Sequence, residues 1–295
     1  MHAVEKNDCL SPPSSCTMPT MKKNLPHLAA QVRMDALKMI YAASSGHPGS
    51  SFSCVDILVT LYFDGFLAFN PKNPHWEGRD YLVMSKGHAA PALYAILGEL
   101  GFFEKEEFFR LRQVDALLQG HPETFIPGVE VASGPLGQGI SVASGIAMGL
   151  TIDKKPNKVF SLHGDGELQE GNIWEGVMTA AKHHLGNYVA IIDKNGLQID
   201  GPTREVMPIT NIADAFSAFH WEVMEMDGHD FDDMHKTIQK AVEVTEKPVC
   251  IIAHTIKGKG VSFMENEVGW HGKAPNDEEF EKAMAQLREE YERTQ

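Results

Sequence analysis

Two polar residues that lie far apart in the chain stand out as ligands for a hard metal ion. Asp165 lies in a Gly-Asp-Gly sequence, and Asn195 lies in Asp-Lys-Asn-Gly. Each follows an apolar run typical of a buried strand, at 158–163 and at 188–192. Because the carboxyl ends of parallel strands meet at one edge of a sheet, we expect the two side chains to converge there. Carboxylate and amide oxygens, beside the free N–H groups of a helix N-terminus at the same crevice, suit Mg²⁺ carrying a diphosphate.

The segment between these two residues supports that interpretation. It is long enough for one crossover helix that returns the chain to a parallel strand. The alternative is that Gly164, Asp165 and Gly166 form an ordinary tight turn and that Asn195 caps a loop. The turn alone favours this alternative, whereas the strand–helix–strand context and the spacing favour the cofactor site.

Composition and charge exclude some classes of function. The 295-residue chain has a net charge of −14, which argues against nucleic-acid binding, because that activity needs a basic face. Its four cysteines lack the spacing of a metal or redox site. This usage is typical of a reducing cytosol, so we expect a cytoplasmic protein. No apolar run approaches the roughly 18 residues of a membrane span.

Alternating strand and helix patterns predict a doubly wound, mainly parallel α/β sheet with helices on both faces. The expected strands are 81–84, 158–163, 188–192, 221–225 and 249–253. The expected helices are 25–43, 53–63, 89–99, 104–112, 141–150, 230–244 and one that starts at the capping-box pair Asn276 and Glu279. Small residues in 141–150, among them Gly145 and Gly149, predict close packing of that helix on the sheet. We expect one domain over 25–295, after a disordered Pro- and Ser-rich extension at 1–24.

Histidines next to glycine form a second group of candidate functional residues. Five of the 14 histidines have this neighbour at expected loop positions: His47, His88, His121, His163 and His271. Such a histidine can approach a ligand closely, because its neighbour has no side chain. A zinc site is one alternative, but no HxxxH pair or cysteine partner supports it. Simple surface exposure is another alternative, and for His163 the choice between exposure and function stays open.

The order of several short motifs resembles that of the N-terminal half of transketolase. These motifs are Ser-Gly-His-Pro-Gly at 45–49, Ser-Lys-Gly-His at 85–88, Gly-His-Pro-Glu at 120–123, the run at 127–139 that ends in Ser-Gly-Pro-Leu-Gly-Gln-Gly, the segment 164–175 and Trp-His-Gly at 270–272. The motifs at 120–123 and 127–139 are more similar to transketolase than to 1-deoxyxylulose-5-phosphate synthase or the pyruvate dehydrogenase α subunit. The resemblance implies the diphosphate domain of the thiamine-diphosphate-binding fold.

The resemblance assigns the metal and diphosphate contacts to the two sheet-edge motifs. Asp165 and Asn195 would ligate Mg²⁺, or another divalent cation such as Ca²⁺ or Mn²⁺, by their side chains. Leu197 would ligate it by its backbone carbonyl, and the N–H of Gly166 would hold the diphosphate.

The rest of the cofactor and the substrate would meet other loops. His88 and His271 would flank the diphosphate of thiamine diphosphate, with His271 also near the substrate. The carbonyl of Gly134 would accept from the aminopyrimidine, and Leu136 and Ile199 would pack on the thiazolium.

The same resemblance places catalytic groups around the substrate. His121 would hydrogen-bond the C1 hydroxyl of a ketose donor, and His47 would assist proton transfer at the acceptor. Glu170, taken as catalytic, and Glu175, taken as cofactor-binding, match acidic residues where the family links its two active sites. A solvated helix face is the alternative for both glutamates.

Most transketolases are about twice as long as this chain, and the resemblance places a glutamate that activates the cofactor in the half that is missing here. We therefore expect the N-terminal subunit of a split transketolase, active with a separate pyrimidine-domain subunit in an α2β2 assembly. The implied reaction transfers a two-carbon ketol unit from a ketose or ketose phosphate to an aldose or aldose phosphate. The alternatives are a member of a specialised pathway that acts on an unusual sugar, and a non-catalytic cofactor-binding module.

Overall fold

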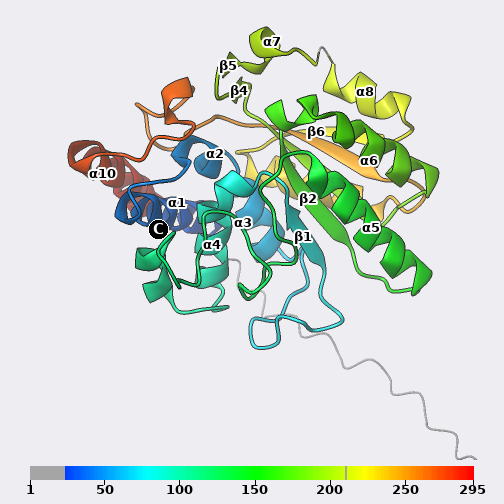
Figure 1. Ribbon diagram of the computed structural model, residues 1–295, viewed down its shortest axis with the longest axis horizontal. Helices are drawn as coiled ribbons and strands as arrows, with labels where there is room; N and C mark the ends of the chain where they lie inside the picture. The colour runs from blue at the N-terminus through cyan, green and yellow to red at the C-terminus, as the bar shows by residue number, and fades with distance from the viewer. Residues whose placement is uncertain (1–23, 210) are drawn as a thin grey trace, which may run out of the picture.

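A five-stranded parallel sheet forms the centre of the protein in a computed structural model that describes residues 24–209 and 211–295 (Figure 1). Its strands are β1 (Tyr81–Met84), β2 (Val159–Gly164), β3 (Tyr188–Lys194), β6 (Glu222–Asp227) and β7 (Val249–His254). The order across the sheet is β1-β2-β3-β7-β6, and every neighbouring pair runs parallel. The expected strands and the parallel α/β fold are confirmed.

Helices cover both faces of this sheet. The helices are α1 (Leu25–Ala42), α2 (Pro48–Ser53), α3 (Val55–Phe63), α4 (Ala90–Glu99), α5 (Gln138–Ile152), α6 (Gly171–Lys182), α7 (Thr203–Val206), α8 (Ile212–Ala218), α9 (Phe231–Glu243) and α10 (Asp277–Arg293). One buried cluster packs α1, α3, α4, α9 and α10 on the sheet, and a second packs α5, α6 and α8 on the opposite face. Figure 1 shows α5 and α6 side by side on one flank of the sheet, away from α1 and α10.

The central strand β3 has a continuous run of apolar residues because both of its faces are buried. Val189 and Ile191 belong to one buried cluster, whereas Ala190 and Ile192 belong to the other. Successive side chains of a strand point to opposite faces, so a strand covered on both sides needs apolar residues at every position.

The connection from β2 to β3 places the candidate metal ligands. Helix α6 is the crossover, and the register pairs Gly164 with Asp193. The residues that follow each strand, Asp165 and Asn195, therefore leave the sheet at the same edge, as predicted.

The helical predictions were wrong in detail at three places. Residues 53–63 do not form one helix, because α2 starts early at Pro48 and the chain bends at Cys54 before α3 begins. The helix expected at 104–112 is a 3₁₀ helix over Lys105–Arg110. The hairpin of β4 (Leu197–Gln198) and β5 (Gly201–Pro202), with α7 and α8, was not predicted, since these elements are too short to show a period.

Helix α5 packs on the sheet with only part of its small-residue face. Ala143, Ser144 and Ala147 are buried, as expected. Gly145 and Gly149 are exposed, and a Cβ atom added at either would meet nothing within 4 Å. The prediction was wrong for these two glycines, because the helical repeat turns them toward the outer face.

The predicted capping box of the last helix is confirmed. The Asn276 side chain accepts from the N–H of Glu279 at 2.9 Å, and the Glu279 carboxylate accepts from the N–H of Asn276 at 2.9 Å. At the other end of the chain, Asn24 caps α1 by accepting from the N–H of His27 at 3.3 Å. The remainder of the extension expected at 1–24 lies outside the described residues.

Candidate active site

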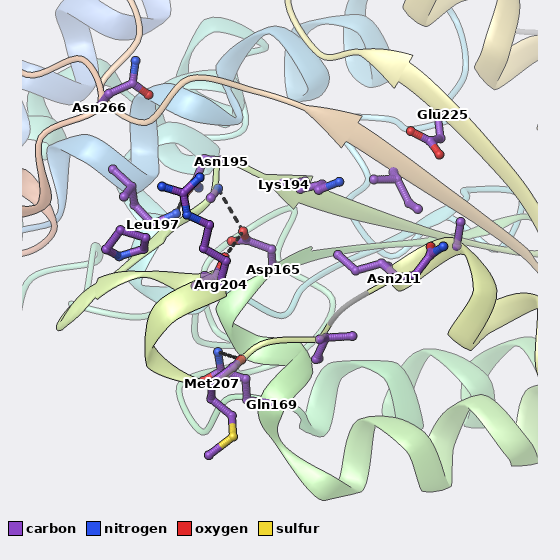
Figure 2. Close-up of a pocket in the computed structure, with 17 residues that line it drawn as sticks. Asp165, Gln169, Lys194, Asn195, Leu197, Arg204, Met207, Asn211, Glu225 and Asn266 are labelled. Carbon is purple, nitrogen blue, oxygen red and sulfur yellow. Dashed lines mark hydrogen bonds between the residues drawn. The ribbon is translucent and has the colours of Figure 1, made fainter.

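Asp165 is the anchor of the sheet-edge site. It is 6% exposed, and its carboxylate accepts from the N–H groups of Gly166 at 3.0 Å and Gly196 at 2.9 Å and from the Thr203 hydroxyl at 3.2 Å (Figure 2). Burial and the nearby Asp193 raise its pKa, while the hydrogen bonds oppose that shift. The bond to Gly196 joins the turn after β2 to the turn after β3, so the convergence expected from the sequence is present.

The N–H groups beside Asp165 belong to a shorter element than predicted. Gly166–Gln169 is a 3₁₀ helix, and α6 begins only at Gly171. The backbone N–H of Gly166 therefore points to a carboxylate here and not along a long helix axis. The helix N-terminus expected at this crevice is therefore that of a short 3₁₀ helix and not that of the crossover helix.

The donor set at this edge suits a hard cation. Asp165 supplies carboxylate oxygens, the side-chain oxygen of Asn195 accepts from the N–H of Leu197 at 3.2 Å, and the Leu197 carbonyl lies in the same turn. Oxygen ligands of these kinds are the ones that Mg²⁺ and Ca²⁺ prefer. Among residues 24–209 and 211–295, no group of three or more His, Cys, Asp and Glu side chains is placed to hold a metal. A cation here would thus depend on amide and backbone oxygens as well.

Three of the predicted histidines form a cluster. The ring centroids of His47 and His88 lie 5.2 Å apart, those of His47 and His271 lie 5.6 Å apart, and those of His88 and His271 lie 5.3 Å apart. They come from three loops that are distant in sequence. The buried Nδ1 atoms of His47 and His271 have no hydrogen-bond partner among the described residues. Buried polar atoms are seldom left unpaired, so these atoms fit a site that is completed by a ligand.

The same histidines are neutral at physiological pH. Burial, followed by the charge of Arg112, lowers the pKa of His47 to about 4. Burial and then Lys257 lower the pKa of His271 to about 3, and burial and then Lys86 lower the pKa of His88 well below its usual range. A neutral imidazole has one donor and one acceptor nitrogen, which is the form that can both bind a polar ligand and transfer a proton.

Lys257 places a positive charge beside this cluster. It is 1% exposed, and its ammonium group donates to the Ser50 hydroxyl at 3.1 Å and to the Leu197 carbonyl at 3.4 Å. None of the ion pairs formed within the described chain includes it, and burial, followed by the charge of Lys86, lowers its pKa to about 8. An unpaired buried cation is unfavourable unless an anion meets it, so Lys257 fits a diphosphate.

Lys86 behaves differently, because its charge is already matched. Its ammonium group forms a buried ion pair with Asp193, which also accepts from the hydroxyls of Ser53 and Thr255. The sequence patterns did not indicate Lys86 or Lys257 as functional residues. A lysine shortly after a buried strand is the signal that would have found them, since both follow strands that end at the edge of Asp165.

His121 lies next to Gly134, in the loops that precede α5. A Cβ atom added at Gly134 would lie 3.8 Å from the His121 ring, and the N–H of Ser133 donates to the Pro122 carbonyl at 3.0 Å. The structure therefore brings together the two loops that were predicted to contact the substrate and the aminopyrimidine. Two further predicted contacts, Leu136 at 37% and Ile199 at 68%, are exposed apolar side chains.

His163 is not a loop residue. It lies within β2 and is fully buried, and its Nε2 atom is 2.7 Å from the Ser161 hydroxyl, which in turn is 2.7 Å from the Tyr188 hydroxyl. The loop position and the surface exposure considered for it were both wrong. The strand at 158–163 continues through the histidine. Its Nε2 atom finds a partner inside the sheet, whereas its buried Nδ1 atom has no hydrogen-bond partner among the described residues.

Glu170 and Glu175 remain without an assigned contact. Glu170 directly precedes α6 and Glu175 lies on it, and both are exposed. Neither forms an ion pair within the described chain.

A cavity of about 460 Å³ adjoins Asp165 and Asn195 (Figure 2). Its lining comes largely from the hairpin, α7 and the start of α8, and it includes the polar side chains of Arg204 and Asn211. None of the clustered histidines lines it. The two candidate metal ligands thus contact this cavity from the sheet edge, and the hairpin covers one side of them.

Comparison with known proteins assigns this arrangement to a family. Residues 26–293 match the profile of the transketolase, thiamine diphosphate binding domain. The chain belongs to the transketolase family. It is 41% identical over 261 residues to an apulose-4-phosphate transketolase subunit of Phocaeicola vulgatus, covering 88% of this chain and 92% of that protein. It is 38% identical over 268 residues to a 6-deoxy-6-sulfo-D-fructose transketolase subunit of a Clostridium species, covering 90% and 97%.

Single-chain transketolases match over only part of their length. Human transketolase is 38% identical over 252 residues, covering 83% of this chain and 39% of the human protein. The crystal structure of Campylobacter jejuni transketolase superposes with a TM-score of 0.85 at 34% identity, covering 92% of this chain and 45% of that one. This transketolase chain therefore corresponds to the thiamine-diphosphate-binding part of those enzymes. Within its described part, no helix has both the length and the apolar character needed to cross a membrane.

Proposed function

We propose that this chain is the N-terminal subunit of a thiamine-diphosphate-dependent transketolase that works with a separate pyrimidine-domain subunit. It would transfer a two-carbon ketol unit from a ketose or ketose phosphate to an aldose or aldose phosphate. The observation that carries the proposal is the meeting of Asp165, Asn195, Lys257 and the histidine cluster at one edge of the sheet. Oxygen ligands next to a buried ammonium group without an ion-pair partner among the described residues would suit a metal-bound diphosphate.

The cofactor contacts follow from this geometry. Asp165, Asn195 and the Leu197 carbonyl would hold Mg²⁺. Lys257 would meet the diphosphate, as would the N–H of Gly166 in place of its present bond to Asp165. His88 and His271 would flank the diphosphate. When bound, thiamine diphosphate supplies the nucleophilic carbon that cleaves the C2–C3 bond of a ketose. The carbonyl of Gly134 would orient the aminopyrimidine, and the exposed Leu136 and Ile199 would cover the thiazolium and exclude water.

The protein's own part in the reaction would fall to neutral histidines. His121 would orient the donor through its C1 hydroxyl, and His47 and His271 would exchange a proton with the sugar oxygen at the reacting carbon. Their lowered pKa values favour the unprotonated form that can accept this proton. A module that only binds the cofactor has no use for such groups, so they argue against a non-catalytic role.

A partner subunit is supported by the outer surface of α5 and α6. Val142 is 37%, Ile152 is 73% and Met178 is 48% exposed, and Gly145 and Gly149 lie on the same outward side of α5. Apolar side chains grouped on neighbouring helices are typical of a protein interface. We assign this surface to the pyrimidine-domain subunit, in an α2β2 assembly in which Glu170 and Glu175 would link the two active sites. Such an enzyme of sugar metabolism, as in the pentose phosphate pathway, would work in the cytoplasm.

Membership of a specialised pathway is the second candidate. Two relatives that this chain matches over nearly their whole length are named for apulose 4-phosphate and for 6-deoxy-6-sulfo-D-fructose. These names favour a donor other than the common pentose phosphates. The histidine cluster suits a common pentose phosphate and an unusual sugar equally, because it would contact the reacting end of the sugar.

Ketol transfer in the presence and absence of a pyrimidine-domain partner tests the proposal. We expect no turnover by the single chain and activity with the partner on xylulose 5-phosphate and ribose 5-phosphate. Activity with the partner on other sugars only would favour the specialised pathway. Robust turnover by the rigorously purified single chain would overturn the two-subunit proposal.

A further inference from the structure

One buried carboxylate joins three loops of the site. Glu167 is 3% exposed and accepts hydrogen bonds from the N–H of Gly137 at 2.8 Å, from the N–H of Gly164 at 3.0 Å and from the Ser85 hydroxyl. The Nδ1 atom of His163 lies 3.5 Å from the same carboxylate. The donors come from the ends of β1 and β2 and from the turn before α5, so the carboxylate is their common acceptor.

Each of these loops carries a different part of the proposed cofactor site. Ser85 precedes the loop of His88, and Gly164 begins the turn of Asp165. Gly137 ends the loop that starts at Gly134, whose carbonyl would meet the aminopyrimidine. Both carboxylate oxygens of Glu167 accept hydrogen bonds from these loops. Glu167 therefore holds the diphosphate end and the ring end of the site together.

The loops are closely packed around the carboxylate. A Cβ atom added at Gly139 would lie 2.2 Å from the Ser85 hydroxyl oxygen, and Gly137 has a left-handed backbone with φ +83°. An ionised carboxylate only accepts hydrogen bonds, whereas an amide in its place must turn an NH₂ group toward one of the donors. Loss of the charge would therefore leave a buried N–H unpaired and push one loop away.

His163 closes the arrangement from the core side. Its ring lies between Glu167 and the Ser161 hydroxyl, which contacts the Tyr188 hydroxyl. This chain of polar groups runs from the centre of the sheet to the loops and limits the positions that the carboxylate can take. It also accounts for a histidine inside an otherwise apolar strand.

We propose that Glu167, supported by His163, is a positioning residue that fixes the diphosphate turn relative to the ring-binding loop. The identity of the cofactor rests on the function proposed above. Without Glu167 each half of the site would keep its own structure, but the position of one half relative to the other would change. A ligand that spans both halves should therefore suffer more than one that occupies a single half.

Calorimetry on the full chain tests this with Glu167→Gln and two ligands, Mg²⁺–thiamine diphosphate and Mg²⁺–pyrophosphate. We expect the affinity for thiamine diphosphate to fall on the order of 10- to 100-fold, as is typical when a supporting contact behind a ligand is lost. The affinity for pyrophosphate should change by less than about threefold, because it contacts the diphosphate half alone. Asp80→Asn is the matched control, since Asp80 is another carboxylate that accepts two backbone N–H bonds, at 2.9 and 2.7 Å, away from the site.

Amide hydrogen exchange gives a second readout without any ligand. In Glu167→Gln the N–H groups of Gly137 and Gly164 should exchange faster than in the wild type, and in Asp80→Asn they should not. If Glu167→Gln does not fold, Ser85→Ala, which removes one donor, should show the same preference for loss of thiamine diphosphate over pyrophosphate. Equal loss of both ligands, or loss of neither, would overturn the positioning role. Failure of the wild type to bind thiamine diphosphate would instead overturn the proposed cofactor, and the positioning role with it.

Discussion

The ammonium group of Lys257 lies 3.4 Å from the carbonyl oxygen of Leu197, the backbone group expected to ligate the metal. The two residues follow neighbouring strands, β7 and β3, and so meet at the sheet edge where Asp165 also lies. A protein cation therefore already contacts an oxygen that the metal would use. This places Lys257 where a metal-bound diphosphate would neutralise its charge.

Replacement of this lysine should weaken cofactor binding without destabilising the fold. In Lys257→Met we expect thiamine diphosphate to bind about 10- to 100-fold more weakly, because a charged hydrogen bond is lost. The unfolding free energy of the cofactor-free chain should rise by about 1 kcal/mol, because an unpaired buried charge is removed. Calorimetry and urea unfolding measure the two effects. Lys259→Met, two positions along the same loop, is the control, and a matching loss of affinity there would contradict the assignment.

Asp165→Ala should abolish Mg²⁺-dependent binding of thiamine diphosphate and leave the chain folded. Asp165 is the only anionic group of the proposed ligand set, and a hard cation depends strongly on it. Titration calorimetry, with circular dichroism to verify the fold, measures this. Asp153→Ala, at the exposed end of α5, should bind normally. Near-normal affinity in the Asp165 variant would remove it from the metal site.

His121→Ala should impair the reaction with ketose donors far more than cofactor binding. The side chain lies beside Gly134, and loss of one positioned hydrogen-bonding group lowers turnover on the order of 10²-fold. Donor kinetics of the enzyme reconstituted with its partner test this, with exposed His183→Ala as the control. Unchanged donor kinetics would exclude His121 from the substrate site.

The histidine cluster should make the cofactor-free chain less stable in mild acid. The pKa of His47 is lowered to about 4 and that of His271 to about 3, against 6.5 for an unperturbed histidine. Between pH 6.5 and 4 the unfolded chain therefore binds protons that the folded chain excludes, so stability is full above pH 6.5 and falls as the pH falls.

His47 should account for roughly 1 kcal/mol of the unfolding free energy that is lost as the pH falls. The effect is this small because the ring is partly exposed to solvent. Urea unfolding at pH 7.5 and pH 4.5 measures the difference. The double variant His47→Gln/His271→Gln should lose less stability between the two pH values than the wild type. An identical pH dependence in both proteins would show that the acid sensitivity arises elsewhere.

A charge on the outer face of α6 should block assembly with the partner. In Met178→Lys we expect association at least about tenfold weaker, because a cation would be buried in an apolar interface. The lone chain should unfold as the wild type does, since Met178 is 48% exposed. Analytical ultracentrifugation with the pyrimidine-domain subunit measures the effect. A complex of unchanged strength would place the partner on another surface.

The amino-acid sequence by itself determined the elements that carry the site. Apolar runs that end in Gly-Asp-Gly and in Asp-Lys-Asn-Gly place Asp165 and Asn195 at strand ends, and parallel strands expose their ends at one edge. Glycine beside His47, His88 and His271 marked loops that can approach a ligand. These are local signals, because strand period, turn residues and capping depend on neighbours in sequence.

Only the tertiary structure decided which distant polar and charged groups form hydrogen bonds with each other. The strand order brings the loop of Lys257 to the Leu197 carbonyl, and it places Glu167 among donors from three loops. It also buried His163, for which surface exposure had been one of the alternatives. The partner of a buried polar atom is set by packing across the sheet, and no period or turn in the sequence encodes that choice.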